Sequence, residues 1–121
     1  MDIERYMDGP TRTASILTSG FTFPPEFIGF QGHFPTNKIL PGACQIQCII
    51  STIQKALDKR VVLKEILLAK YIAPVYPGDN VTCTVSGVPD TGMDFIYKAR
   101  ITKGTEKVTD LKLRVTLSDA I

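Results

Sequence analysis

The chain has 121 residues, of which 44% are apolar and 21% are charged. This length predicts one domain, residues 1–121, and the composition supplies enough apolar surface for its core, which excludes a disordered chain. Its 14 basic and 12 acidic side chains leave a formal net charge of +2, and no basic run is present, so nucleic-acid binding is not expected.

Neither a secretory signal nor a membrane-spanning segment is expected. The first ten residues hold three acidic side chains and no apolar run, and nothing approaches the roughly 18 apolar residues of a spanning helix. The three cysteines lack the spacing of a disulfide framework, which favours free buried thiols in a reducing compartment. We therefore expect a soluble, cytoplasmic protein that does not bind membranes.

The first element expected is a strand near Thr11–Ser19. It is followed by residues 21–35, FTFPPEFIGFQGHFP, which hold five of the six phenylalanines. Because these rings alternate irregularly with proline and glycine, the segment is predicted to be neither helix nor strand. Two interpretations are open: the rings pack into the core, or they form the wall of an apolar pocket.

A helix is predicted from Gly42 to Leu57, directly after Pro41. Apolar residues recur there at spacings of one, three and four, which is typical of an amphipathic helix. They are Ile46, Ile49, Ile50, Ile53 and Leu57. We expect this stripe to face the core.

From Arg60 onward the sequence favours strands, because β-branched and aromatic residues alternate with polar ones. Turns are predicted at Pro89–Gly92 and Lys103–Thr105, which gives about four antiparallel strands. Val108 is out of phase and predicts a bulge near Thr109. One long helix against an antiparallel sheet defines an α+β fold.

His33 is the only histidine, and its side chain has an ordinary pKa near neutrality. It lies eight residues before Pro41, where the predicted helix would expose unpaired N–H groups able to bind a carbonyl oxygen. A base and such amides are the groups that an enzyme needs at least in order to remove a proton α to a thioester. The alternative is a purely structural histidine.

Three stretches together resemble the hotdog-fold 3-hydroxyacyl-acyl carrier protein dehydratases. They are FQGHFP (30–35), ILPGA (39–43), and Tyr71 with PVYPGD (74–79). The resemblance implies a sheet wrapped around a central helix, and a homodimer or higher oligomer in which His33 of one chain lies near Gln47 of the other. It implies that His33 is the base, that the amides of Gly42 and Ala43 hold the thioester carbonyl, and that no cofactor is needed. An apolar tunnel for the acyl chain would be lined by Phe30, Phe34 and Pro41.

The sequence departs from the resemblance at Gln47, where an acidic residue is expected six positions after Pro41. The helix holds no acid before Asp58, and glutamine cannot release a proton at neutral pH. Gln47 is predicted to lie in the pocket as a substitute for the catalytic acid. The alternative is a solvated helix face, since small and polar residues share its stripe: Ala43, Gln47, Ser51 and Gln54.

Three functions fit these observations. The first is a dehydratase-like hydro-lyase of fatty-acid or polyketide-type synthesis, with catalysis weakened by Gln47. The others are an acyl thioesterase and a non-catalytic acyl-binding subunit, for instance one half of a mixed dimer. The acyl group would be carried on acyl carrier protein or coenzyme A, with Lys38 and Lys70 as candidates for attracting an acidic carrier. Cys44 and Cys48 share a helix face but do not complete a zinc site with one histidine, so no metal is expected.

Overall fold

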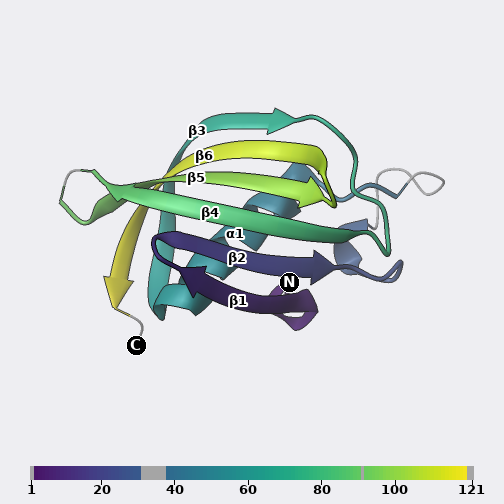
Figure 1. The fold of residues 1–121 in the computed structure, drawn as a ribbon, viewed down its shortest axis with the longest axis horizontal. Coiled ribbons are helices and arrows are strands. Elements are labelled where there is room, and N and C mark those ends of the chain that lie inside the picture. The colour runs from purple at the N-terminus through teal and green to yellow at the C-terminus, as the bar shows by residue number, and fades with distance from the viewer. Residues whose placement is uncertain (1, 31–37, 91, 120–121) are drawn as a thin grey trace.

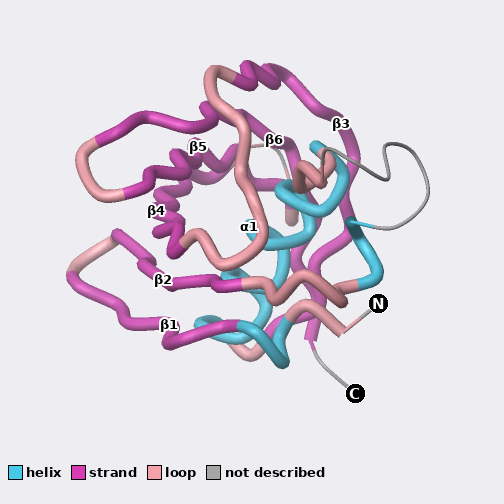
Figure 2. Tube along the Cα trace, turned by 90° about the vertical axis from the view of Figure 1, so that its right-hand side faces the viewer, coloured by secondary structure: helices cyan, strands magenta, loops and turns pink. Residues whose placement is uncertain are grey.

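The computed structural model describes residues 2–30, 38–90 and 92–119. In this part of the chain, a six-stranded antiparallel sheet curves around helix α1 (Gly42–Leu57), which lies against its inner face (Figures 1 and 2). The strand order is β1-β2-β4-β5-β6-β3. The strands are β1 (Met7–Thr13), β2 (Ile16–Thr22), β3 (Lys59–Tyr71), β4 (Asn80–Pro89), β5 (Asp94–Lys103) and β6 (Glu106–Asp119). The α+β class is therefore confirmed.

The predicted helix is confirmed with the same bounds. Ile49 and Ile53 are fully buried, whereas Ile46 and Ile50 are only partly buried. The side of α1 that faces the core is rotated from the predicted apolar stripe, because it also includes polar residues. These residues form hydrogen bonds between the helix and the sheet. The buried residues are Cys44, Gln45, Cys48, Ile49, Ser51, Thr52 and Ile53.

The prediction of one strand near Thr11–Ser19 is wrong, because this range contains the turn of a hairpin. β1 ends at Thr13 and β2 begins at Ile16, and the two strands pair antiparallel. Ala14 occupies the left-handed region of the backbone with φ 54°. Tight hairpin turns usually carry glycine, asparagine or aspartate, so an Ala-Ser turn gives no sequence signal.

The phenylalanine-rich segment packs into the core as far as it is described. Phe23 and Phe27 have ring centroids 4.5 Å apart, and Phe21 and Phe30 extend this aromatic cluster at 5.9 Å on either side. All four side chains are buried. The core-packing interpretation is therefore confirmed for residues 21–30, and residues 31–35 lie outside the described part.

The C-terminal strands form the two predicted hairpins, with the predicted bulge. Ile101 pairs with Thr109 but Thr102 pairs with Lys107, which leaves Val108 as the extra residue of β6. Val108 and Thr109 are consequently both buried. Among the described residues, no helix has the length and hydropathy required to cross a bilayer.

Candidate active site

The first turn of α1 begins with two amides that have no hydrogen-bond partner among the described residues. The Pro41 carbonyl accepts hydrogen bonds from the amides of Cys44 and Gln45 at 3.0 and 3.1 Å. Within the described residues, nothing accepts a hydrogen bond from the amides of Gly42 or Ala43. Unpaired N–H groups at a helix start carry partial positive charge, so they can stabilise an oxygen that gains negative charge. These are the two amides that the sequence analysis assigned to the thioester carbonyl.

Tyr71, the last residue of β3, packs over this helix start. A Cβ atom added at Gly42 would lie 2.5 Å from the Tyr71 hydroxyl oxygen and 2.6 Å from its ring carbon Cζ. Glycine at position 42 therefore lets the ring approach this closely, and a larger residue would require Tyr71 to move. The Tyr71 side chain is 48% exposed, and burial of the remainder raises its pKa, so the hydroxyl stays protonated and can donate a hydrogen bond.

Gln45 fixes the helix start relative to the surrounding chain. Its Nε2 donates to the Leu40 carbonyl at 3.2 Å, and its Oε1 accepts a hydrogen bond from Thr109 Oγ1. The Leu40 amide in turn donates to the Val75 carbonyl at 2.8 Å. The buried Gln45 thus links the segment before α1 to strand β6. This link holds the Gly42 and Ala43 amides in place.

Gln47 lies one helical turn after Ala43, about 6 Å further along the axis on the same face. Its Nε2 donates to Ser51 Oγ at 3.3 Å, and no described residue donates to its Oε1. Gln47 is partly buried and Ser51 is buried. In the same stripe Ala43 is exposed and Gln54 is partly buried, and the Gln47 amide keeps hydrogen-bonding capacity for a ligand.

The other predicted site residues divide into two groups. Phe30 is buried against Phe27, with ring centroids 5.9 Å apart, and Pro41 is partly buried at the N-cap of α1. His33 and Phe34 lie outside the described residues, so their assigned roles stay predictions. The sequence indicated Tyr71 only as part of a motif and did not indicate Gln45. Their contacts, Tyr71 with Gly42 and Gln45 with Thr109, join residues that are far apart in the chain.

The three cysteines are buried, and burial raises the pKa of each thiol. The pKa of Cys83 rises to about 12. Because the thiolate is the nucleophilic form, these cysteines are poor nucleophiles near neutral pH. Among the described residues, no cluster of three or more potential ligands could hold a metal ion.

Comparison with known proteins gives both a family and a fold. Residues 10–111 match the family model of ApeI-like proteins, described as ApeI dehydratase. A 72-residue segment is 42% identical to the 3-hydroxyacyl-[acyl-carrier-protein] dehydratase FabZ of Ehrlichia chaffeensis, and it covers 55% of this chain and 49% of that protein. The chain therefore matches about half the length of this relative.

Two solved structures show the hotdog fold that the sequence predicted. The dehydratase heterocomplex ApeI:P from Xenorhabdus doucetiae superposes with a TM-score of 0.69 at 18% identity, over 91% of this chain and 93% of that chain. A mutant of the fluoroacetyl-CoA-specific thioesterase FlK, in complex with fluoroacetate and CoA, gives a TM-score of 0.73 at 12% identity. That match covers 89% of this chain and 95% of the other.

Proposed function

Because the chain belongs to the ApeI-like dehydratase family, we propose that it binds 3-hydroxyacyl or enoyl thioesters and interconverts them only weakly. The observation that carries this proposal is the helix start, where the amides of Gly42 and Ala43, which no described residue pairs, lie one turn before Gln47. The amides supply a site for the thioester carbonyl, and Gln47 lies within reach of the same substrate. What is missing from this helix face is a carboxylic acid.

In the dehydration direction, His33 would remove the α proton while the amides of Gly42 and Ala43 stabilise the negative charge that develops on the carbonyl oxygen. The Tyr71 hydroxyl, packed on Gly42, can add a third donor. As the double bond forms, the C3–O bond breaks and the 3-hydroxyl leaves as water, with a proton that solvent water must supply because this helix face offers no acid. Gln47 can orient this hydroxyl but cannot protonate it, and the loss of a general acid lowers the rate by about 10² to 10⁴.

We also propose that a second hotdog chain pairs with β3. The two sheet edges differ: β1 has 7 residues and contains Pro10, whereas β3 has 13 residues and no proline. β3 also exposes large apolar side chains such as Val62 and Ile66. A long apolar edge strand favours pairing with another chain. A homodimer is the first expectation, and a mixed dimer would let the partner supply the missing acid.

The acyl carrier is proposed to be acyl carrier protein or coenzyme A. Of the two lysines suggested for attracting an acidic carrier, Lys38 donates to the Pro25 carbonyl at 3.3 Å. Lys70 is exposed on β3 opposite Asp110 of β6. Neither forms an ion pair within the described residues, so both can contribute to carrier association, which salt would weaken.

The proposed function can be tested by hydration of a crotonyl thioester on both carriers, followed by ultraviolet absorbance. We expect slow hydration by the wild type and none by His33→Ala, with unchanged unfolding curves. Activity that persists in His33→Ala would overturn the assignment of the base. Sedimentation should show a dimer at micromolar concentration, and a monomer would contradict pairing through β3.

A further inference from the structure

The outer face of the sheet carries a groove that is separate from the helix start. It lies across β3, β4, β5 and β6 and has a volume of about 490 Å³, within the range of small-molecule sites. Three cations and one carboxylate line it, together with two hydroxyl groups and the apolar residues Leu68, Ala99 and Leu111. The polar lining residues are Thr84, Ser86, Lys98, Arg100, Asp110 and Lys112.

The sheet register arranges these side chains in two parallel rows. One row runs through Thr84, Arg100, Asp110 and Lys70, and the other through Ser86, Lys98, Lys112 and Leu68. In the first row Arg100 donates to Asp110 at 2.8 Å. In the second row Lys98 and Lys112 stand directly opposite each other, where cross-strand Cβ atoms are about 5 Å apart and like charges destabilise the sheet.

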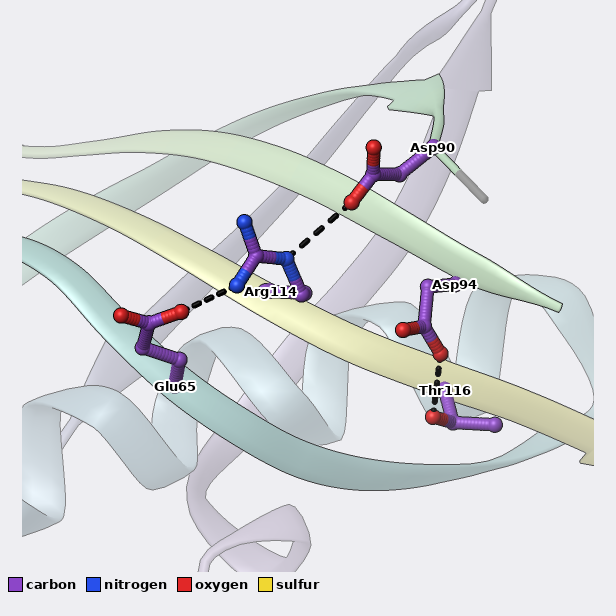
Figure 3. Close-up of polar contacts among 5 residues, drawn as sticks. All are labelled: Glu65, Asp90, Asp94, Arg114 and Thr116. Atoms are coloured by element: carbon purple, nitrogen blue, oxygen red, sulfur yellow. Dashed lines mark hydrogen bonds and ion pairs between the residues drawn. The ribbon is translucent and has the colours of Figure 1, made fainter. Parts of the chain in front are cut away.

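No carboxylate of the described residues lies within ion-pair distance of Lys98 or Lys112. On the same face Arg100 and Arg114 are paired with carboxylates, whereas Lys70 is not paired with any described carboxylate. Arg114, two residues after Lys112, contacts both Glu65 and Asp90 (Figure 3), and it donates to Asp90 at 3.1 Å. Lys98 and Lys112 are therefore two facing lysines that line the groove without a counter-ion among the described residues.

We propose that the groove binds a phosphate monoester between Lys98 and Lys112. A carboxylate carries one charge, whereas a phosphate monoester carries about −1.5 to −2 near pH 7 and matches two ammonium groups. Its three acceptor oxygens can also accept hydrogen bonds from the hydroxyls of Ser86 and Thr84. Asp110 does not oppose this binding strongly, because both of its oxygens face cations, Arg100 at 2.8 Å and Lys107 at 3.7 Å.

The phosphate can come from two sources. Coenzyme A ends in a 3′-phosphate monoester, so the groove would hold the carrier of the acyl group, an assignment that rests on the proposed function. A separate phosphorylated metabolite would use the same chemistry without any link to the acyl site. Dephospho-coenzyme A separates the two sources because it lacks the monoester and keeps the rest of the molecule.

The experiment uses the full chain at low salt, with three probes: inorganic phosphate, coenzyme A and dephospho-coenzyme A. Affinities come from calorimetry, and the site comes from backbone amide shifts at the groove. The test variant is Lys98→Gln/Lys112→Gln, and the matched control is Lys55→Gln with Lys64→Gln, which removes two exposed lysines that do not line the groove. Unfolding curves check that all three proteins fold alike.

We expect inorganic phosphate to shift groove amides in the wild type and the control, and to bind the test variant about tenfold more weakly. A preference for coenzyme A over dephospho-coenzyme A, lost in the test variant, would assign the site to the acyl carrier. Phosphate binding without that preference would support the site and assign it to another phosphorylated ligand. Phosphate shifts that are absent, or equal in all three proteins, would overturn the proposal. None of these readouts requires enzymatic activity, so failure here is distinct from failure of the proposed function.

Discussion

Gln45 and Gln47 are two residues apart on the same helix, yet their surroundings are opposite. Two residues turn the chain by about 200° around the helix axis, which places the side chains on different faces. Gln45 is buried, with a donor and an acceptor each engaged, whereas Gln47 is partly buried with one contact of 3.3 Å and an oxygen that receives no described donor. Gln45 therefore holds the helix start in place, whereas the Gln47 side chain is available to bind a ligand.

The largest expected effect is that of a charge at the buried position. In Gln45→Glu, burial disfavours the carboxylate and raises its pKa above that of the unfolded chain. The folded variant then binds its proton more tightly, so relative stability is greatest at acid pH and falls as the pH rises. We expect a loss of about 3 kcal/mol or more near pH 8 and much less near pH 4.5, because a protonated carboxyl can still donate to Leu40.

Urea unfolding of Gln45→Glu and the wild type at both pH values measures this difference. Gln47→Glu is the comparison variant, and its partly exposed carboxyl should change stability little at either pH. Equal pH profiles for the two variants would contradict the contrast between the two faces.

Substitution by alanine should distinguish the two glutamines by a smaller difference in the free energy of unfolding. Gln45→Ala removes two hydrogen bonds and leaves the buried Thr109 hydroxyl and the Leu40 carbonyl without partners, which we expect to cost about 2 to 4 kcal/mol. Gln47→Ala should cost less than about 1 kcal/mol. The midpoints of urea unfolding give both values, and a Gln47 loss as large as that of Gln45 would place Gln47 among the structural residues.

The helix start gives the next smaller effect. Gly42→Ala forces a Cβ atom against the Tyr71 ring and should cost about 1 to 3 kcal/mol. Tyr71→Ala removes the ring that the added Cβ atom would contact. Tyr71→Ala should therefore destabilise the Gly42→Ala variant less than it destabilises the wild type. A double-mutant cycle of unfolding free energies measures this coupling. Strict additivity would show that the ring does not press on Gly42.

Features that depend on residues close together in the chain could be predicted from the sequence. The bounds of α1 followed from Pro41 and the helical spacing, and the bulge at Val108 followed from a break in alternation. The Ala14 turn was missed because its residues are not those that turns prefer. Gln45 could not be assigned because its partner Thr109 is 64 positions away, and the facing Lys98 and Lys112 emerge only from the strand register.

The central claim is that a glutamine at position 47 is what limits catalysis, and one substitution tests it most directly. Crotonyl-thioester hydration should be compared in the wild type, Gln47→Glu, and the matched control Gln54→Glu, which places the same charge two turns further along the same helix face. When the bound thioester shields the new carboxyl from water and raises its pKa, that carboxyl can act as a general acid. We therefore expect Gln47→Glu to exceed the wild type by about 10² to 10⁴ and Gln54→Glu to equal the wild type. If Gln47→Glu gains no rate while it still binds the thioester, or if the wild type already turns over at an ordinary dehydratase rate, the claim is wrong.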